Sequence, residues 1–499
     1  MTPLTAGVLD RAQAAPLIWI TVPSLPGGYV GPMMALMTYA AGGRRRSLGA
    51  LLAALALAPA ARAAADPPFT AAERVIIGAA LGLEDRRFDL DDRALSGRIL
   101  AYARVETGQR VRPSRIDSDW ALAPPVRDLA AELAAARAAG RLDAWLGGLA
   151  PPAPAYRALV AVRDRYAMTV DVGGWPGVPG GPTLRLGDRD GGVTALRARL
   201  AAEGYGAGSG DLALFDAELE AALRAFQDLH GLEVDGVLGP ATRAALNVTA
   251  AERLAQIDAN LERWRWMPHA PPGYRLEVDT GAQEAVLYSG GTPVQRMRVI
   301  VGSPKHPTPM FSAQVEGVIL NPPWNVPASI ARNELLPTEA RRPGYLASMG
   351  IRWVDGRLQQ RPGPKNSLGV IKFDVPNRFG VYLHDTPAKG LFAQPVRAFS
   401  HGCMRLQEPR ALALTLLGPQ GMSAETLDAG IAAGVTRRIG LARRLPLYVV
   451  HWTVRVEPDG RVGFRPDIYG WDRKLAAALP KAVTSASQAA ARPARRAPV

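Results

Sequence analysis

The chain has 499 residues, a length that predicts about three domains of roughly 150 residues each. It is 48% hydrophobic and 21% charged, as soluble globular proteins are, so a wholly disordered chain is excluded. Lys and Arg number 59 against 45 Asp and Glu, which gives a formal net charge of +14 at pH 7. The single cysteine, Cys403, excludes an intrachain disulfide, a cysteine-rich zinc site and an iron–sulfur cluster.

Residues 1–65 are interpreted as an upstream extension followed by a secretory signal peptide. Arg44–Arg46 precede the apolar run Leu48–Leu57, and a small-x-small sequence follows at Ala61–Ala63. A basic segment, a short apolar segment and a cleavage site of this kind are typical of export signals, and the apolar run is short for a membrane span. We therefore expect an exported protein whose translation starts at Met37. A buried Ala/Leu helix and an uncleaved anchor are the alternatives.

Residues 66–180 are predicted to form a helical scaffold domain. Leu129, Leu133 and Ala136 recur at helical spacing before Gly140, and a Gly/Pro-rich linker ends this part of the chain. The segment contains no clustered histidine or cysteine and no glycine-rich phosphate loop. A structural role is the interpretation that follows.

Residues 181–250 predict a compact unit of three helices. Leu196 and Leu200 mark the first helix, Leu223 and Phe226 mark the second, and Gly239-Pro240 opens the third, where a proline in the first turn costs no hydrogen bond.

The scaffold or linker helix in residues 251–271 ends in Arg263-Trp264-Arg265-Trp266. Interleaved Arg and Trp side chains can stack bases or sugars. More often such a run forms aromatic core with arginine stems lying over it, which is the interpretation that we favour.

Residues 272–470 predict a mainly β domain, because the hydrophobic period changes from helical spacing to alternation. An arginine-rich, partly helical insertion at about 327–361 interrupts it, and insertions of this length in compact domains are usually functional and often act as lids. The Ala-rich basic segment 474–499 is expected to be a disordered tail. Strands are predicted at residues 275–279, 285–288, 294–300, 315–321, 369–373, 381–384 and 447–456.

The candidate catalytic residues lie between positions 384 and 403. His384 ends a predicted strand, and Gly402 precedes Cys403 in Ser400-His401-Gly402-Cys403, which permits close backbone approach to a substrate carbonyl. A thiol needs a neighbouring base or cation to become a good nucleophile, and a histidine can supply the base. The backbone N–H groups of Gly402 and Cys403 are the expected oxyanion donors.

Two other interpretations of this cluster were weighed. A lone cysteine is usually an inert buried residue, but one beside glycine and two residues from a histidine is a different case. His384, His401 and Cys403 are also zinc-ligand types, yet neither a fourth ligand nor the usual spacing is present. No metal and no cofactor is therefore expected.

Two known families resemble these segments. The three-helix unit resembles the peptidoglycan-binding domain, and the β domain resembles the L,D-transpeptidases with a YkuD-type catalytic domain. The latter carry a His, a gap and then Ser/Thr-His-Gly-Cys, commonly followed two residues later by Asn or Arg. Here fifteen residues separate His384 from Ser400, and Arg405 occupies the last position of the motif. The segments that carry the two resemblances are Leu184–Gly187, Phe226-Gln227, His230–Leu232, Asp235-Gly236, Gly239-Pro240, Thr242, Leu246-Asn247, Asn321–Pro327, Pro362–Asn366, His384–Pro387 and Ser400–Arg405.

The resemblance to the long, multidomain branch of L,D-transpeptidases implies a concrete activity. Cys403 would attack the carbonyl before the terminal D-Ala of a stem peptide, and a diaminopimelate amine of a second stem would resolve the thioester. His384 matches the base, while Ser400, His401 and Gly402 match the motif loop. The resemblance further implies that Tyr382, Arg405 and Trp324 line the substrate pocket, and that carbapenems acylate the thiol.

The sequence thus predicts an α+β multidomain enzyme located in the periplasm and associated with the cell wall. Its implied partners are the stem peptides and glycan of peptidoglycan, and cell-wall synthesis machinery is a further candidate. An L,D-carboxypeptidase, another cysteine hydrolase or a non-catalytic wall-binding protein are the alternatives. Nucleic-acid binding is disfavoured because lysines are scarce and no recognition motif is present, and no stable membrane span is expected.

Overall fold

The computed structural model describes residues 67–82, 90–208 and 210–479. The chain divides into two compact units, Met1–Ala65 and Asp66–Val499, and only the second contains described residues. The predicted signal peptide, the start at Met37 and residues 480–499 of the predicted tail lie outside the described residues. Within the described ranges, no helix has both the length and the apolar character needed to cross a bilayer.

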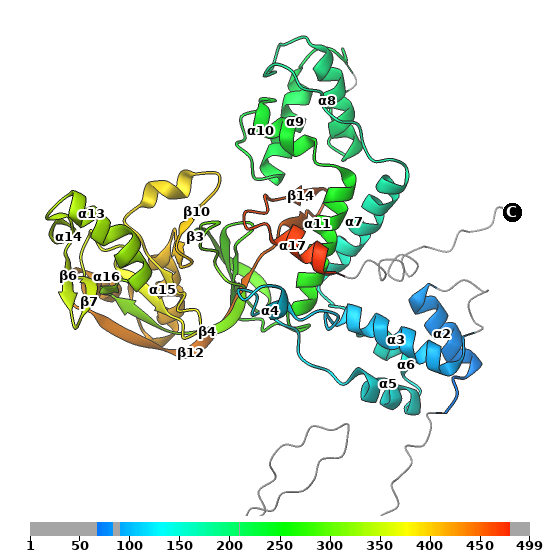
Figure 1. Ribbon diagram of the computed structural model, residues 1–499, viewed down its shortest axis with the longest axis horizontal. Helices are drawn as coiled ribbons and strands as arrows, with labels where there is room; N and C mark the ends of the chain where they lie inside the picture. Colours follow the sequence, from blue (N-terminus) through cyan, green and yellow to red (C-terminus); the bar gives the residue numbers. More distant parts are fainter. Residues whose placement is uncertain (1–66, 83–89, 209, 480–499) are drawn as a thin grey trace, which may run out of the picture. The chain divides into compact units, whose positions relative to one another are not determined.

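The first described part is helical (Figure 1). Three of its helices begin at a side chain that binds a free backbone N–H group, and one of these, Thr70, forms a reciprocal capping box with Glu73. Ile77, Ile99 and Leu149 are fully buried in the core that these helices share. The helices are α2 (Ala71–Leu81), α3 (Asp92–Glu106), α4 (Pro113–Ile116), α5 (Leu129–Ala138), α6 (Leu142–Gly147) and α7 (Pro154–Asp171).

The predicted three-helix unit is present, as α8 (Gly191–Ala202), α9 (Ala217–Leu229) and α10 (Pro240–Leu246). Asp190 and Asp216 cap the first two helices, and Gly239 precedes the third, which starts at a proline as predicted. The apolar stripes meet in one core that is separate from the core of the β domain.

Helix α11 (Ala250–Trp266) follows directly and carries the Arg-Trp run. Trp266 is fully buried, and Trp264 stacks on Trp452 with ring centroids 4.8 Å apart. The arginines do not lie over this core as expected, because both are buried within it in ion pairs. Arg263 pairs with Asp472 at 2.5 Å, and Arg265 pairs with Glu106 at 3.1 Å.

The β domain is built on a nine-stranded sheet with the order β10-β3-β11-β9-β8-β4-β12-β1-β2, and β2 also pairs with β3. Alternating apolar side chains from these strands form its core, against which helices α15 (Pro409–Leu417) and α16 (Ala424–Ala432) pack. The strands are β1 (Arg275–Asp279), β2 (Glu284–Ser289), β3 (Thr292–Gly302), β4 (Phe311–Leu320), β8 (Ile371–Asp374), β9 (Leu383–His384), β10 (Ala398–Ser400), β11 (Met404–Leu406) and β12 (Arg437–Val450).

Most strand boundaries differ from the prediction by up to about four residues, as at β4, and one differs by much more. The last long strand was expected at 447–456, but β12 begins ten residues earlier, at Arg437. Its first part is rich in arginine and mostly exposed, so it lacks the apolar alternation by which a strand is predicted. Long-range pairing with β4 stabilises it instead.

The insertion forms a small module with its own core of Val326, Leu335, Ile351 and Leu358. The side-chain amide of Asn366 ties its two ends together by donating to the carbonyls of Pro322 and Arg361, both at 3.0 Å. The elements of the module are β5 (Trp324–Asn325), α12 (Ala328–Ile330), the π-helical turn η2 (Ala331–Leu335), α13 (Leu336–Arg341), α14 (Tyr345–Ser348), β6 (Ile351–Val354) and β7 (Arg357–Gln360).

The chain then forms a hairpin, β13 (Val454–Val456) and β14 (Val462–Phe464), and a final helix, α17 (Trp471–Ala478). The prediction of a disordered tail from residue 474 is therefore wrong for its first residues. Leu475 is fully buried beside Trp471, and Lys474 forms an ion pair with Asp117 at 2.7 Å. The high alanine content had concealed this short amphipathic helix.

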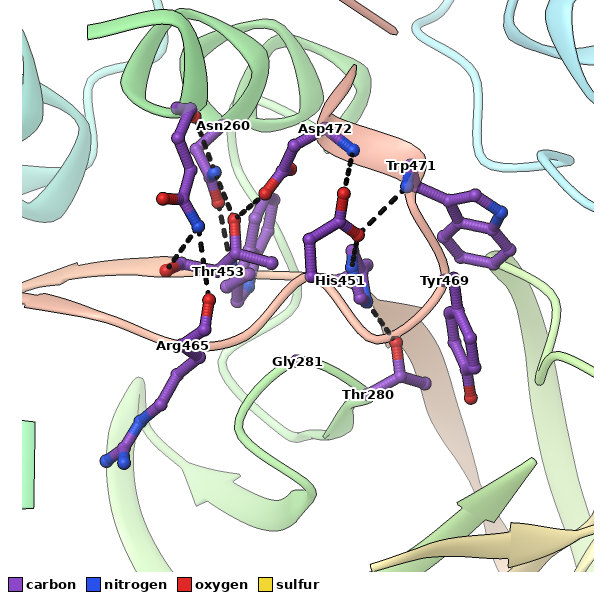
Figure 2. Close-up of polar contacts among 12 residues, drawn as sticks. Asn260, Thr280, Gly281, His451, Thr453, Arg465, Tyr469, Trp471 and Asp472 are labelled. Atoms are coloured by element: carbon purple, nitrogen blue, oxygen red, sulfur yellow. Dashed lines mark hydrogen bonds and ion pairs between the residues drawn. The ribbon is translucent and has the colours of Figure 1, made fainter. Parts of the chain in front are cut away.

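A buried polar network joins α11, the end of β12 and α17 (Figure 2). The side chain of Asn260 donates to the hydroxyl of Thr453 at 2.7 Å, and that hydroxyl donates to Asp472 at 2.7 Å. His451 lies between Thr280, at 2.8 Å, and Asp467, at 3.4 Å. Because buried polar groups need such partners, the network fixes one arrangement of these elements.

The buried ion pairs of α11 yield a stability prediction. Arg265→Met leaves Glu106 and Glu262 buried without this cation, so we expect a loss of about 3–5 kcal/mol in the free energy of unfolding. Urea denaturation followed by circular dichroism measures it. Arg410→Met is the matched control, because it removes an exposed pair with Asp428 and should leave the midpoint nearly unchanged. Equal midpoints for the two variants would contradict the prediction.

Candidate active site

The register of three neighbouring strands brings the predicted residues together. Lys372 on β8 pairs with His384 on β9, and His384 pairs with Arg405 on β11. The residues that alternate with them, Phe373, Leu383 and Met404, are buried in the core. The three polar side chains therefore lie on the opposite face of the sheet. Tyr382 and Cys403 come two residues before His384 and Arg405, immediately ahead of β9 and β11, and their contacts with Lys372 place them on that same face.

The loop before Cys403 is held by hydroxyl groups. Ser400 Oγ donates to the Cys403 carbonyl at 2.6 Å and accepts from the Gly402 N–H at 3.1 Å. Thr308 Oγ1 donates to the Gly402 carbonyl at 2.8 Å. Gly402 has a φ of +105°, which other residues rarely adopt, and an added Cβ would lie 3.4 Å from the Pro307 carbonyl.

These bonds correct one expectation. The Gly402 N–H was predicted to be an oxyanion donor, but in this structure it is engaged by Ser400. The Cys403 N–H makes no hydrogen bond with any residue that the structure describes. Of the two predicted donors, the amide of Cys403 is thus the one that remains available.

Tyr382 is the polar neighbour of the thiol. Its backbone N–H and its hydroxyl both donate to Cys403, and the Trp324 indole N–H donates to that hydroxyl. Burial raises the pKa of the Cys403 thiol, and the bonds from Tyr382 oppose this rise. The thiol is therefore protonated at rest but is provided with donors for a thiolate.

His384 is 4% exposed and has a defined tautomer. Its Nδ1 lies 2.5 Å from the Asp385 carbonyl, which only accepts, so the proton is on Nδ1 and Nε2 carries the lone pair. Burial and the charge of Arg405 lower the pKa of His384 to about 3. The resting pair is thus a neutral thiol and a neutral imidazole. The two side chains are diagonal neighbours on adjacent strands, and catalytic hydrogen bonds often form only when substrate is bound.

Lys372 was missed by the sequence analysis. Its ammonium lies 3.8 Å from the ring centroid of Tyr382. Burial lowers the pKa of Lys372, and the nearby Cys403 thiol opposes this effect. The only available signal was a lysine at the centre of Ile371-Lys372-Phe373, a predicted buried strand.

Arg405 is the group best suited to hold a substrate carboxylate. Its Nε is buried without a hydrogen-bond partner, and it makes no ion pair with any described carboxylate. A guanidinium with free donors matches the planar geometry of a carboxylate. With Lys372 it makes this face of the sheet cationic.

His401 contacts the insertion rather than the thiol. Its Nε2 lies 2.6 Å from Glu334 Oε1 of the insertion, and its ring lies 4.8 Å from that of His306. Its side chain is 38% exposed, in contrast to the buried His384. This arrangement favours His384 as the base, a choice that spacing in the sequence left open.

The zinc alternative receives no support from the geometry. Among residues 67–82, 90–208 and 210–479, no group of three or more His, Cys, Asp or Glu side chains is arranged to hold a metal ion.

A prediction concerns the thiol. Tyr382→Phe removes a donor to the thiolate, so we expect the Cys403 pKa to rise by about one unit and alkylation at neutral pH to slow. The pH dependence of iodoacetamide labelling reports Cys403 alone, because the chain has one cysteine. Tyr288→Phe, on strand β2 and away from the thiol, is the control and should leave the profile unchanged. An unshifted profile in Tyr382→Phe would rule out this role for the hydroxyl.

A second prediction concerns the contact between the insertion and the motif loop. Glu334→Gln weakens the bond to His401, so amide hydrogen exchange at residues 331–341 should accelerate by up to about fivefold. Mass spectrometry of exchanged peptides measures this change. Asp355→Asn, between β6 and β7 of the same module, should have no such effect. If both variants exchange alike, the Glu334–His401 contact does not hold the insertion.

Comparison with protein families matches three segments of the chain. Residues 273–422 match the YkuD family, described as the L,D-transpeptidase catalytic domain. Residues 189–246 match a family described as "Putative peptidoglycan binding domain", and residues 76–162 match a scaffold domain.

Two curated relatives are similar to parts of the chain. One, named "Putative L,D-transpeptidase", is from Haemophilus influenzae and is 30% identical over 237 residues, which cover 43% of this chain and 48% of that protein. The other, an N-acetylmuramoyl-L-alanine amidase of Mycobacterium tuberculosis, is 45% identical over 75 residues, 13% of this chain and 18% of that protein. The chain thus spans about half the length of the first relative and less of the second.

Solved structures of L,D-transpeptidases also resemble the chain. One from Xylanimonas cellulosilytica has 18% identity and a TM-score of 0.19, covering 54% of this chain and 98% of its own. L,D-transpeptidase 3 of Mycobacterium tuberculosis, with a faropenem-derived adduct, has 16% identity and a TM-score of 0.20, covering 36% and 61%. These TM-scores are too low to add to the assignment, which rests on the family matches. Residues 273–422 are thus similar to the L,D-transpeptidase catalytic domain of the YkuD family, and residues 189–246 to the family described as a putative peptidoglycan binding domain.

Proposed function

We propose that this chain is a peptidoglycan L,D-transpeptidase with Cys403 as its nucleophile. The observation that carries the proposal is the shared sheet face, on which one thiol, one buried neutral histidine and two cations lie in register. The two domain matches support peptidoglycan as the substrate.

In the first half-reaction, Cys403 Sγ attacks the carbonyl carbon that precedes the terminal D-Ala of a donor stem. The thiol proton passes to His384 Nε2 as the carbon–sulfur bond forms, and the oxyanion accepts from the Cys403 N–H. His384 then returns the proton to the leaving nitrogen, the carbon–nitrogen bond breaks, and D-Ala leaves. The product is a thioester on Cys403.

In the second half-reaction, the side-chain amine of a diaminopimelate residue in an acceptor stem attacks the thioester carbonyl. His384 accepts a proton from this amine and delivers it to the departing sulfur. A diaminopimelate-to-diaminopimelate amide is formed and the thiol is regenerated. Microscopic reversibility gives His384 the same two roles in both halves.

The electrostatics of the site suit this sequence. Proton transfer within a neutral pair creates a thiolate and an imidazolium at the moment of attack. Lys372, Arg405 and the bonds from Tyr382 stabilise the thiolate. The same cations disfavour a protonated His384, so the proton is readily passed on to the leaving nitrogen.

The resolving nucleophile separates the alternatives. If water instead of an amine attacks the thioester, the protein is an L,D-carboxypeptidase or another stem-peptide hydrolase. A non-catalytic wall-binding protein requires neither Cys403 nor His384. The Tyr382 donors to the thiol favour an enzyme over a wall-binding protein.

The proposal includes the location of the protein. The two peptidoglycan domains indicate a cell-wall context. We propose export to the periplasm by the signal within residues 1–65, association of residues 189–246 with peptidoglycan, and work alongside cell-wall synthesis enzymes.

The decisive test incubates the protein with tetrapeptide muropeptides and analyses the products by mass spectrometry. Cross-linked dimers and free D-Ala are expected. Cys403→Ala should abolish them, and His384→Gln should lower the rate by at least about 100-fold, the usual contribution of a general base. His269→Gln, outside the site, should retain the activity.

Two outcomes would contradict the proposal. Undiminished dimer formation by Cys403→Ala excludes the thioester, and tripeptides without dimers identify a carboxypeptidase. A carbapenem should add its mass to the native chain and leave Cys403→Ala unmodified.

A further inference from the structure

A cavity lies away from the thiol, where the peptidoglycan-binding domain meets α11 and the C-terminal segment. Its volume is about 600 Å³, which accommodates a small sugar or a short peptide. None of its lining residues belongs to the face formed by β8, β9 and β11. The polar side chains on its wall are His230, Glu252, Arg253, Gln256, Arg465, Asp467, Asp472 and Arg473.

His230 presents a buried acceptor to this cavity. The residue is 2% exposed, and its Nδ1 lies 2.8 Å from the Phe226 carbonyl, so Nδ1 carries the proton. Burial and the charges of Arg253, Arg199 and Arg465 lower the pKa of His230, which keeps the ring neutral. Its Nε2 lone pair is buried without a hydrogen-bond partner. A ligand N–H or O–H group would complement it.

Arg253 presents a buried donor on the same wall. It is 6% exposed, and its two terminal nitrogens donate to Gln256 Oε1 and to the Ala245 carbonyl, both at 3.1 Å. Its guanidinium lies over the Phe464 ring, 4.4 Å from the centroid. Its Nε is buried without a partner. Two buried unpaired polar atoms of opposite kind on one wall are unusual in a native fold.

The charges of the cavity favour an anionic acceptor. Glu252 closes the capping box of α11, Asp467 binds the first N–H groups of α17, and Asp472 pairs with Arg263. Figure 2 shows Asp472 turned toward Thr453, within the network described above. In contrast, Arg253 and Arg473 form no ion pair with any described carboxylate.

We propose that this cavity binds a carboxylate ligand that carries a neighbouring N–H or O–H group. The carboxylate pairs with Arg253, the donor group binds His230, and the apolar part lies against Phe464 and Leu232. A muramoyl residue of glycan from which the stem has been removed and the C-terminal end of a stem peptide both offer this chemistry. The choice of wall-derived ligands rests on the proposed function, whereas the cavity and its unpaired atoms do not.

The test measures binding to the full chain with Cys403→Ala, so that turnover does not interfere. Isothermal titration compares N-acetylmuramic acid with N-acetylglucosamine, which lacks the carboxylate, and with D-alanyl-D-alanine. N-acetylmuramic acid or the dipeptide should bind, and N-acetylglucosamine should bind at least about tenfold more weakly than the better of these two. A preference for the sugar acid identifies the glycan as the source, and a preference for the dipeptide identifies the stem.

Variants locate the binding. His230→Phe preserves the ring stacking on Phe226, which has centroids 3.8 Å apart, but removes the lone pair, so Kd should rise about tenfold. Arg224→Gln, on α9 and outside the cavity, is the matched control. The proposal is overturned if no probe binds in the millimolar range, if N-acetylglucosamine equals the acids, or if His230→Phe binds like the control. Cross-linking activity of the native enzyme is scored separately, so its loss or retention reports only on the proposed function.

Discussion

The parallel pairing of β9 with β11 is the constraint on which the site depends. The Met404 N–H donates to the Tyr382 carbonyl at 3.0 Å, which fixes the position of the cysteine relative to the tyrosine beside it. Because side chains alternate across a sheet, a slip of one residue would turn the thiol toward the core and Met404 toward the substrate. The hydrogen bonds from the hydroxyl groups of Ser400 and Thr308 then orient the backbone that leads into β11. The geometry of the nucleophile is therefore set by backbone pairing before any side-chain chemistry.

Burial controls the chemistry of this face. Enclosure favours the neutral forms of both Cys403 and His384, so the two side chains do not rest as an ion pair. In the proposed reaction, charge separation is deferred to the step in which substrate is attacked, and Lys372 and Arg405 are already in place for it. Such prearranged cations need no reorganisation as the thiolate develops. The thiol is consequently shielded from indiscriminate reaction when no substrate is present.

Much of this arrangement could be predicted from local sequence. Period-two alternation located most strands, proline and capping residues located the helices, and the motif around Cys403 predicted the thiol and the histidine that the sheet brings close together. The role of Lys372 could not be predicted, because it depends on which strands become neighbours. The same holds for the partners of Arg263 and Arg265, which lie far away in the sequence. Helix α17 was missed because its few apolar residues are significant only beside the tryptophans that cover them.

The way in which the insertion joins the sheet has a consequence for how much of this domain can vary. Its entry and exit strands lie close enough for one asparagine side chain to bind both, and its interior is filled by its own apolar residues. Few of its side chains are therefore needed to keep the sheet folded. The module can change in length and surface while the nucleophile stays in register. The insertion and the sheet beside Cys403 are thus built around separate apolar cores within one domain.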